Sequence, residues 1–149
     1  VPGESATAFP APLALAATFD RDLAREHGAA LGRETRGAGQ DALLAPGVNL
    51  IRVPQNGRNF EYLSEDPVLS AAMGARVVAG IQSADAIATP KHYVANSQET
   101  HRASVSAVVP PTSNRRYTAM ADAASRPGNR LPSVVTTGSL EGPVFRPPG

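Results

Sequence analysis

The sequence predicts an α/β protein with a parallel sheet, in the order strand, helix, strand, helix, strand, followed by an irregular C-terminal tail. Short apolar runs alternate with amphipathic stretches through residues 1–109, which is typical of βαβ units. Near Val109 large apolar residues become rare and proline becomes frequent. The length of 149 residues allows one domain but falls short of the roughly 250 residues of a complete (β/α)8 barrel.

The first strand and the first helix are predicted between residues 13 and 39. Residues 13–17 form an apolar run of strand length. A helix follows, and its expected buried stripe recurs every four residues: Phe19, Leu23, His27 and Leu31. Glycines at positions 37 and 39 end this helix. Because His27 belongs to the stripe, we expect a core or boundary residue there rather than a ligand.

The second strand, a long polar loop, the second helix and the third strand come next. Residues 42–45 are a short apolar run, and the loop extends through residues 49–65. Asp66 is suited to cap the second helix, with Pro67 as its first residue. The expected buried stripe of this helix is Leu69, Met73, Val77 and Ile81. Residues 86–89 form the third predicted strand.

Residues 110–149 differ in composition from the rest of the chain. Leu, Ile, Val and Phe make up 25 of the first 109 residues but 6 of the last 40, and 7 of the 14 prolines lie in those 40 residues. No helical or alternating period extends through them, apart from a short helix predicted at residues 117–124. We therefore expect a Pro- and Arg-rich tail of low order, because too little apolar surface is available to offset chain entropy.

Charge and composition exclude several classes of function. A formal net charge of +1 provides no basic surface for nucleic acid or for an anionic membrane, and the absence of cysteine excludes disulfides and thiolate nucleophiles. The longest apolar stretch, residues 11–19, is about half of a membrane span, so we expect a soluble protein, either cytoplasmic or secreted. No metal site is expected, since the spacing of His92, Glu99 and His101 matches no common zinc pattern.

Two polar segments follow the second and the third predicted strands: residues 56–67 and residues 91–102. Reactive groups of parallel α/β sheets collect at the carboxyl ends of strands, so these segments form the candidate site. They supply Arg58, Lys91 and His92, a set of donors suited to a polyhydroxylated ligand. The alternatives are a structural ion pair of Arg58 with Glu61 or Glu65, and a solvated Lys91, which is the only lysine of the chain.

The same two segments resemble a known family. The run GRNFEYLSEDP at residues 57–67 is followed by ATPKHYVAN at residues 88–96 and by QET at residues 98–100. In this order they resemble the N-terminal domain of glycoside hydrolase family 3, in its β-glucosidase and β-xylosidase branch. The resemblance covers about residues 4–109, and YVAN after the Lys-His pair disfavours the branch that cleaves N-acetylglucosaminides.

The resemblance implies a (β/α)8-type barrel, of which residues 1–109 are an incomplete N-terminal part, and hydrolysis of β-linked glycosides with retention of configuration. In the family, the arginine at the position of Arg58 and the pair at Lys91 and His92 hydrogen-bond hydroxyls of the sugar next to the scissile bond. The implied ligand of the parent enzyme is a β-linked glucoside or xyloside. No cofactor is implied.

The family's catalytic groups are missing from this sequence. Retaining hydrolysis needs two carboxyl groups about 5 Å apart. The chain has neither the Ser-Asp-Trp-like motif of the nucleophile nor the Asp-Gly-Pro motif that binds the same sugar, and the acid/base glutamate of the family comes from further downstream. We therefore expect a fragment of a retaining β-glycosidase that keeps part of the sugar subsite and has no catalytic residue. The alternative is a non-catalytic sugar-binding or assembly fragment.

Two explanations of the tail at residues 110–149 are open. One is a shift of reading frame in a GC-rich gene, which 13 arginines against one lysine and the abundance of alanine favour. The other is a natural disordered extension. In either case an incomplete barrel leaves a sheet edge and apolar helix faces without partners. We therefore expect self-association through exposed apolar surface.

Overall fold

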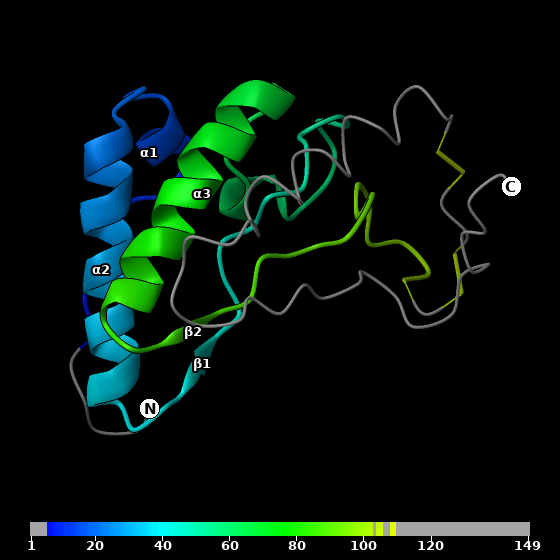
Figure 1. Cartoon of the computed structure of the whole chain (residues 1–149). Coiled ribbons are helices and arrows are strands. Elements are labelled where there is room, and N and C mark those ends of the chain that lie inside the picture. The colour runs from blue at the N-terminus through cyan, green and yellow to red at the C-terminus, as the bar shows by residue number, and fades with distance from the viewer. Residues whose placement is uncertain (1–5, 103, 106–107, 110–149) are drawn as a thin grey trace, which may run out of the picture.

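The computed structural model describes residues 6–102, 104, 105, 108 and 109. Their elements, in chain order, are α1 (Pro12–Ala16), α2 (Arg21–Gly37), β1 (Ala42–Leu43), the 3-10 turn η1 (Asn59–Glu61), α3 (Pro67–Ser83) and β2 (Ile87–Ala88). In Figure 1, α2 and α3 lie side by side, β2 runs next to α3, and β1 lies beside β2. No helix in this part of the chain has the length and apolarity needed to cross a membrane. The predicted tail and its helix at residues 117–124 lie outside the described residues.

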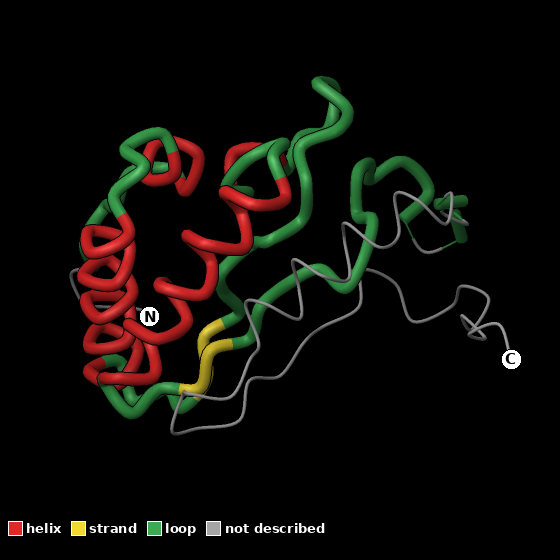
Figure 2. The backbone as a smooth tube through the Cα atoms, turned by 45° about the horizontal axis from the view of Figure 1, so that its top comes forward, coloured by secondary structure: helices red, strands yellow, loops and turns green. Residues whose placement is uncertain are grey.

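The two strands form a parallel pair, and α3 is the crossover between them (Figure 2). The register pairs two residues of each strand: Ala42 with Ile87, and Leu43 with Ala88. Backbone pairing continues past the strands, where the N–H of Lys91 donates to the Pro46 carbonyl at 2.9 Å and the N–H of Val48 donates to the Lys91 carbonyl at 2.5 Å. The α/β class and the parallel pairing are thus confirmed, with strands shorter than the predicted 42–45 and 86–89.

The predicted first strand at residues 13–17 is wrong, because this segment forms the helix α1. Pro12 occupies its first turn, where the fixed φ and the missing N–H of proline are tolerated. Leu15 and Ala16 are buried, whereas Leu13 is exposed. An apolar run of five residues is too short for its period to separate a strand from a helix, and the position of the proline was the better signal.

The buried face of α2 also differs from the prediction. Phe19 precedes the helix and is 72% exposed, Leu23 is 41% exposed, and His27 and Leu31 are only partly buried. The residues of α2 that are buried are small: Ala24, Gly28, Gly32 and Thr35. A search for large apolar side chains at helical spacing misses such a face, because its packing depends on close contact between backbones.

Glycines allow α2 and α3 to approach each other closely. A Cβ added at Gly28 would lie 2.2 Å from the carbonyl oxygen of Val77, and a Cβ added at Gly80 would lie 2.1 Å from the carbonyl oxygen of Arg25. Neither separation leaves space for a methyl group in a close-packed interior. The two helices therefore pack with glycine on both sides of the contact.

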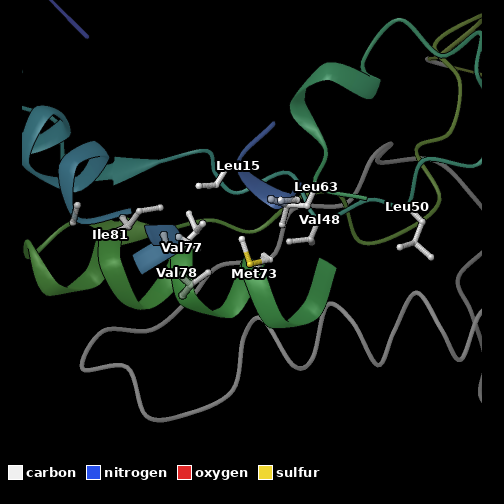
Figure 3. Packing of buried hydrophobic residues seen from close by; sticks show 12 residues of the cluster. Leu15, Val48, Leu50, Leu63, Met73, Val77, Val78 and Ile81 are labelled. Carbon is white, nitrogen blue, oxygen red and sulfur yellow. The ribbon is translucent and has the colours of Figure 1, made fainter. Parts of the chain in front are cut away.

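The apolar core lies between α3 and the extended segments that follow the strands. Asp66 caps α3 by accepting hydrogen bonds from two backbone N–H groups of the first turn, and Pro67 is the first helical residue, both as predicted. Of the predicted stripe, Met73, Val77 and Ile81 are buried, and Leu69 is partly buried against the same cluster. Figure 3 shows Met73, Val77 and Ile81 gathered with other side chains of the core: Leu15, Val48 and Leu63.

Substitution of Gly80 by alanine should lower the free energy of unfolding by about 3 kcal/mol, because the added methyl group overpacks the contact with the backbone of α2. Gly37→Ala is the matched control, since Gly37 is helical, exposed and has no heavy atom within 4 Å of an added Cβ. The control should stabilise the protein by up to about 1 kcal/mol through helix propensity. Urea unfolding followed by circular dichroism measures both effects, and equal stability of the two variants would contradict the packing argument.

Candidate functional site

The candidate site lies just beyond the carboxyl ends of β1 and β2. Gly47, which follows β1, forms parallel bridges with both Tyr62 and Lys91. A little further along, the N–H of Ile51 donates to the Ser64 carbonyl at 3.1 Å. This backbone pairing brings the loop after β1, with η1 at its end, next to the segment after β2. Two segments that are separated by α3 in the sequence thus meet at one place.

Five charged side chains from these segments form a chain of ion pairs with alternating sign. Arg58 pairs through Nε with Oε1 of Glu61, and Lys91 Nζ lies 2.8 Å from the other oxygen, Oε2, of the same carboxylate. Arg58 also pairs with a second carboxylate, since its Nη1 lies 3.2 Å from Glu99 Oε1. The other oxygen of that carboxylate, Glu99 Oε2, lies 3.3 Å from Arg102 Nη1. The side chains of Arg58, Glu61 and Lys91 are only 18–20% exposed, so this end of the cluster is largely withdrawn from solvent, whereas Arg102 at the other end is exposed.

The pairing keeps both carboxylates ionised. Burial opposes ionisation of Glu61, but hydrogen bonds from Arg58 and Lys91 outweigh it and hold the pKa of Glu61 below its usual value. Burial likewise opposes ionisation of Glu99, and hydrogen bonds from Asn96 and Arg58 lower its pKa. Burial disfavours the charged form of Arg58, yet the hydrogen bond and the charge of Glu61 raise the pKa of this guanidinium. Arg58, Glu61 and Glu99 are therefore charged at neutral pH.

His92 lies beside this cluster but is neutral. It is 4% exposed, its Nδ1 is 3.2 Å from the Tyr62 hydroxyl, and the two rings are nearly perpendicular with centroids 6.0 Å apart. Burial, assisted by the positive charges of Arg58 and Lys91, lowers the pKa of His92 to about 4. A neutral imidazole has one donor nitrogen and one acceptor nitrogen, so His92 offers both functions at pH 7.

A buried network around Asn96 connects the two segments. Asn96 Nδ2 donates to Glu99 Oε1 at 2.9 Å and to the Tyr62 hydroxyl at 3.2 Å. The backbone N–H of Asn96 donates to Asn49 Oδ1 at 2.9 Å, and its carbonyl accepts from Asn49 Nδ2 at 3.2 Å. Asn49 lies outside the predicted site segments, and Tyr62 and Asn96 lie within them but were given no role in binding. A signal for Asn49 does exist, since it is the one amide within the apolar run of residues 48–51.

The structure brings the three predicted binding residues, Arg58, Lys91 and His92, into one neighbourhood. The predicted ion pair of Arg58 forms with Glu61 and not with Glu65, which is exposed. Lys91 is paired and mostly buried rather than solvated. Within the described ranges, no group of three or more histidine, aspartate or glutamate side chains is arranged to hold a metal ion. A role in sugar binding stays a prediction for all three residues.

The two parallel strands and their crossover helix define an α/β protein. Its charged and amide groups gather beyond the carboxyl ends of the strands, so the polar site lies at one edge of the sheet. The domain described as "Glycosyl hydrolase family 3 N terminal domain" matches residues 2–121. The chain therefore belongs to glycosyl hydrolase family 3, as the two sequence motifs predicted.

Known relatives cover most of this chain but are much longer. "Probable beta-glucosidase F" of Aspergillus fumigatus is 50% identical over 99 residues, which are 66% of this chain and 11% of that protein. The crystal structure of DesR, a β-glucosidase from Streptomyces venezuelae in complex with D-glucose, matches 92% of this chain and 18% of its own, with 40% identity and a TM-score of 0.81. β-Glucosidase 3B of Thermotoga neapolitana, solved with α-D-glucose, is 53% identical with a TM-score of 0.66, over 67% of this chain and 14% of its own.

Stability should fall in a defined acidic range because of His92. In the unfolded chain this histidine takes up a proton as the pH falls below about 6.5, whereas in the folded protein it does so only near pH 4. The free energy of unfolding should therefore decrease as the pH is lowered from about 6.5 to about 4, and burial of His27, which lowers its pKa, adds in the same direction.

NMR titration of the histidine rings tests this directly. The His92 signals, assigned by their loss in His92→Gln, should titrate with a midpoint near pH 4, and the variant should show a shallower loss of stability between pH 6.5 and pH 4.5. A His92 midpoint close to 6.5 would show that the ring is solvated.

Proposed function

We propose that this chain is part of a retaining β-glucosidase, in which Arg58, Lys91 and His92 hydrogen-bond hydroxyls of the sugar unit next to the scissile bond. The observation that carries the proposal is the convergence of Arg58 and Lys91, from two separate segments, on the single carboxylate of Glu61. The names of the relatives, and glucose in two of the solved structures, support a β-linked glucoside as the substrate. A β-linked xyloside is the second candidate of the same class.

The donors at this site suit a neutral polyol. A guanidinium carries five N–H donors and an ammonium three, so Arg58 and Lys91 keep donors after their ion pairs are made. Hydrogen bonds from charged donors are stronger than those between neutral groups. His92 adds a neutral ring that can donate to one hydroxyl or accept from another.

The larger framework that we propose is a (β/α)8-type barrel, with residues 1–109 as an incomplete N-terminal part and residues 110–149 as a tail outside it. The parallel pair with its crossover helix corresponds to one repeat of such a barrel. A mostly apolar pocket of about 110 Å³ is lined by Leu15, Leu31 and Leu44 and reaches Glu61 and Lys91, and it has room for a side chain of a further barrel element.

The chain by itself is proposed to be catalytically inactive. A retaining glycosidase needs one carboxyl group with a raised pKa to protonate the leaving group. Glu61 and Glu99 are the carboxylates of the site, and their pKa values are lowered instead. Both are also occupied by ion pairs with Arg58, which makes them unsuited to attack a sugar. Hydrolysis of this class uses carboxyl groups and water, so we propose no cofactor.

A second candidate is a non-catalytic sugar-binding or assembly fragment. It is favoured by the number of large apolar side chains that are exposed among the described residues: Leu13, Phe19, Leu23, Leu44, Val53, Phe60, Val68 and Val108. Exposed apolar surface of this kind promotes association between chains. In this alternative the chain acts by contacting sugar or another polypeptide, without bond cleavage.

The purified 149-residue chain should not hydrolyse an aryl β-glucoside, because neither carboxylate of the described site, Glu61 or Glu99, has the raised pKa that an acid/base group needs. Release of the aryl group is measured, with β-glucosidase 3B of Thermotoga neapolitana as the positive control. Activity that persists through repeated purification would refute the expectation.

A chimera of β-glucosidase 3B, in which residues 6–102 of this chain replace the matched segment, separates the two candidate functions. Hydrolysis by the chimera supports the β-glucosidase proposal, and a folded but inactive chimera supports the non-catalytic one.

In the active chimera, Arg58→Ala and Lys91→Ala should each lower kcat/KM by about 10- to 150-fold, since each removes a charged hydrogen bond of about 1.5–3 kcal/mol to a sugar hydroxyl. Arg33→Ala is the matched control, because Arg33 is exposed on α2 and should change kcat/KM by less than about twofold. Equal effects at Arg58 and at Arg33 would show that Arg58 has no role in binding.

A further inference from the structure

We propose that Glu61 is a positioning residue of the sugar site, whose carboxylate holds Arg58 and Lys91 in the orientation that binding requires. The inference rests on the function proposed for these two cations and assigns a role to a third residue. The carboxylate uses one oxygen for each partner, Oε1 for Arg58 and Oε2 for Lys91. The two cations come from opposite sides of α3 in the sequence, so Glu61 is the group that joins them.

The backbone of Glu61 is itself held firmly. Glu61 ends η1, where its N–H donates to the Arg58 carbonyl at 3.1 Å. The next residue, Tyr62, is fully buried. On the strand side a Cβ added at Gly47 would lie 2.3 Å from the carbonyl oxygen of Glu61, so the two backbones are in direct contact. A carboxylate on such a support can fix the place of longer and more flexible side chains.

The two cations depend on Glu61 to different degrees. Arg58 has a second carboxylate partner, Glu99, on its other edge. Lys91 makes its one ion pair with Glu61 among the residues that the structure describes. Without the charge of Glu61, Arg58 and Lys91 would repel each other, and the lysine would regain the rotamer freedom that the ion pair removes. Loss of Glu61 should therefore release Lys91 while Arg58 stays on Glu99.

Glu61→Gln tests this with a side chain of the same shape and no charge. Glu65→Gln is the matched control, since Glu65 is an exposed glutamate four residues further on. Lys91 is the only lysine, so reductive methylation with 13C-formaldehyde places an NMR probe on its Nζ, and the methylated amine keeps its charge. The signal is assigned by its loss in Lys91→Arg.

In the unsubstituted 149-residue chain, the two methyl groups on Nζ should give separate signals, because the ion pair restricts rotation. In Glu61→Gln they should merge into one narrow signal at the position of a free dimethyl-lysine, and in Glu65→Gln they should stay separate. Separate methyl signals in a folded Glu61→Gln chain would overturn the proposal. If that variant does not fold, Glu61→Asp decides, because it keeps the charge but is too short to span both cations. Released methyl signals in this variant support the proposal, and unchanged signals overturn it.

Calorimetric titration of the unmethylated chain with D-glucose separates this inference from the function on which it rests. Glu61→Gln should weaken glucose binding by about tenfold or more, the effect of losing one oriented charged donor, and Glu65→Gln should leave the affinity unchanged. Binding that is equally tight in Glu61→Gln would overturn the positioning role. If the unsubstituted chain binds no glucose while Glu61 still restrains Lys91, the proposed sugar site fails and the tether between Glu61 and Lys91 stands.

Discussion

The parallel pairing of β1 with β2 is the constraint on which the candidate site depends. Because both strands point the same way, the segments that follow them emerge at the same edge of the sheet. The pairing continues as far as Lys91, whose N–H and carbonyl both bond to the backbone after β1. A slip of this register by one residue would turn the Lys91 side chain to the other face of the sheet, away from Glu61. The helix α3 connects the two strands, and its close packing on α2 through glycines holds it in place.

Those parts of the fold with local causes could be predicted from the sequence. The start of α3 followed from Asp66 and Pro67, whose capping and backbone preferences act within one turn. The strand pair followed from apolar runs that flank a helix of sufficient length. The helix α1 also had a local signal in Pro12, whereas the buried face of α2 could not be predicted in the same way. At Gly28 the decisive fact is the position of Val77 on another helix, which no periodicity within α2 contains.

The site shows the same division between local and tertiary causes. Arg58, Lys91 and His92 could be named from their position after strands and from two motifs. The sequence also identified Glu61 as a partner of Arg58, but its contact with Lys91 depends on strand pairing across α3. Buried amides are harder still. Asn96 is placed by hydrogen bonds to residues that lie 34 and 47 positions away, so its role exists only in the folded chain.

The balance of charge within the site favours a neutral ligand over an anionic one. An anion site commonly leaves cations or backbone N–H groups directed at the ligand. Here Arg58 lies between two carboxylates and Lys91 contacts one, so a phosphate group would meet Glu61 and Glu99 as well as the cations. A sugar hydroxyl brings no charge and can accept from the remaining N–H donors without disturbing these ion pairs. The uncharged state of His92 fits the same condition, because a further cation would add repulsion that a neutral ligand could not relieve.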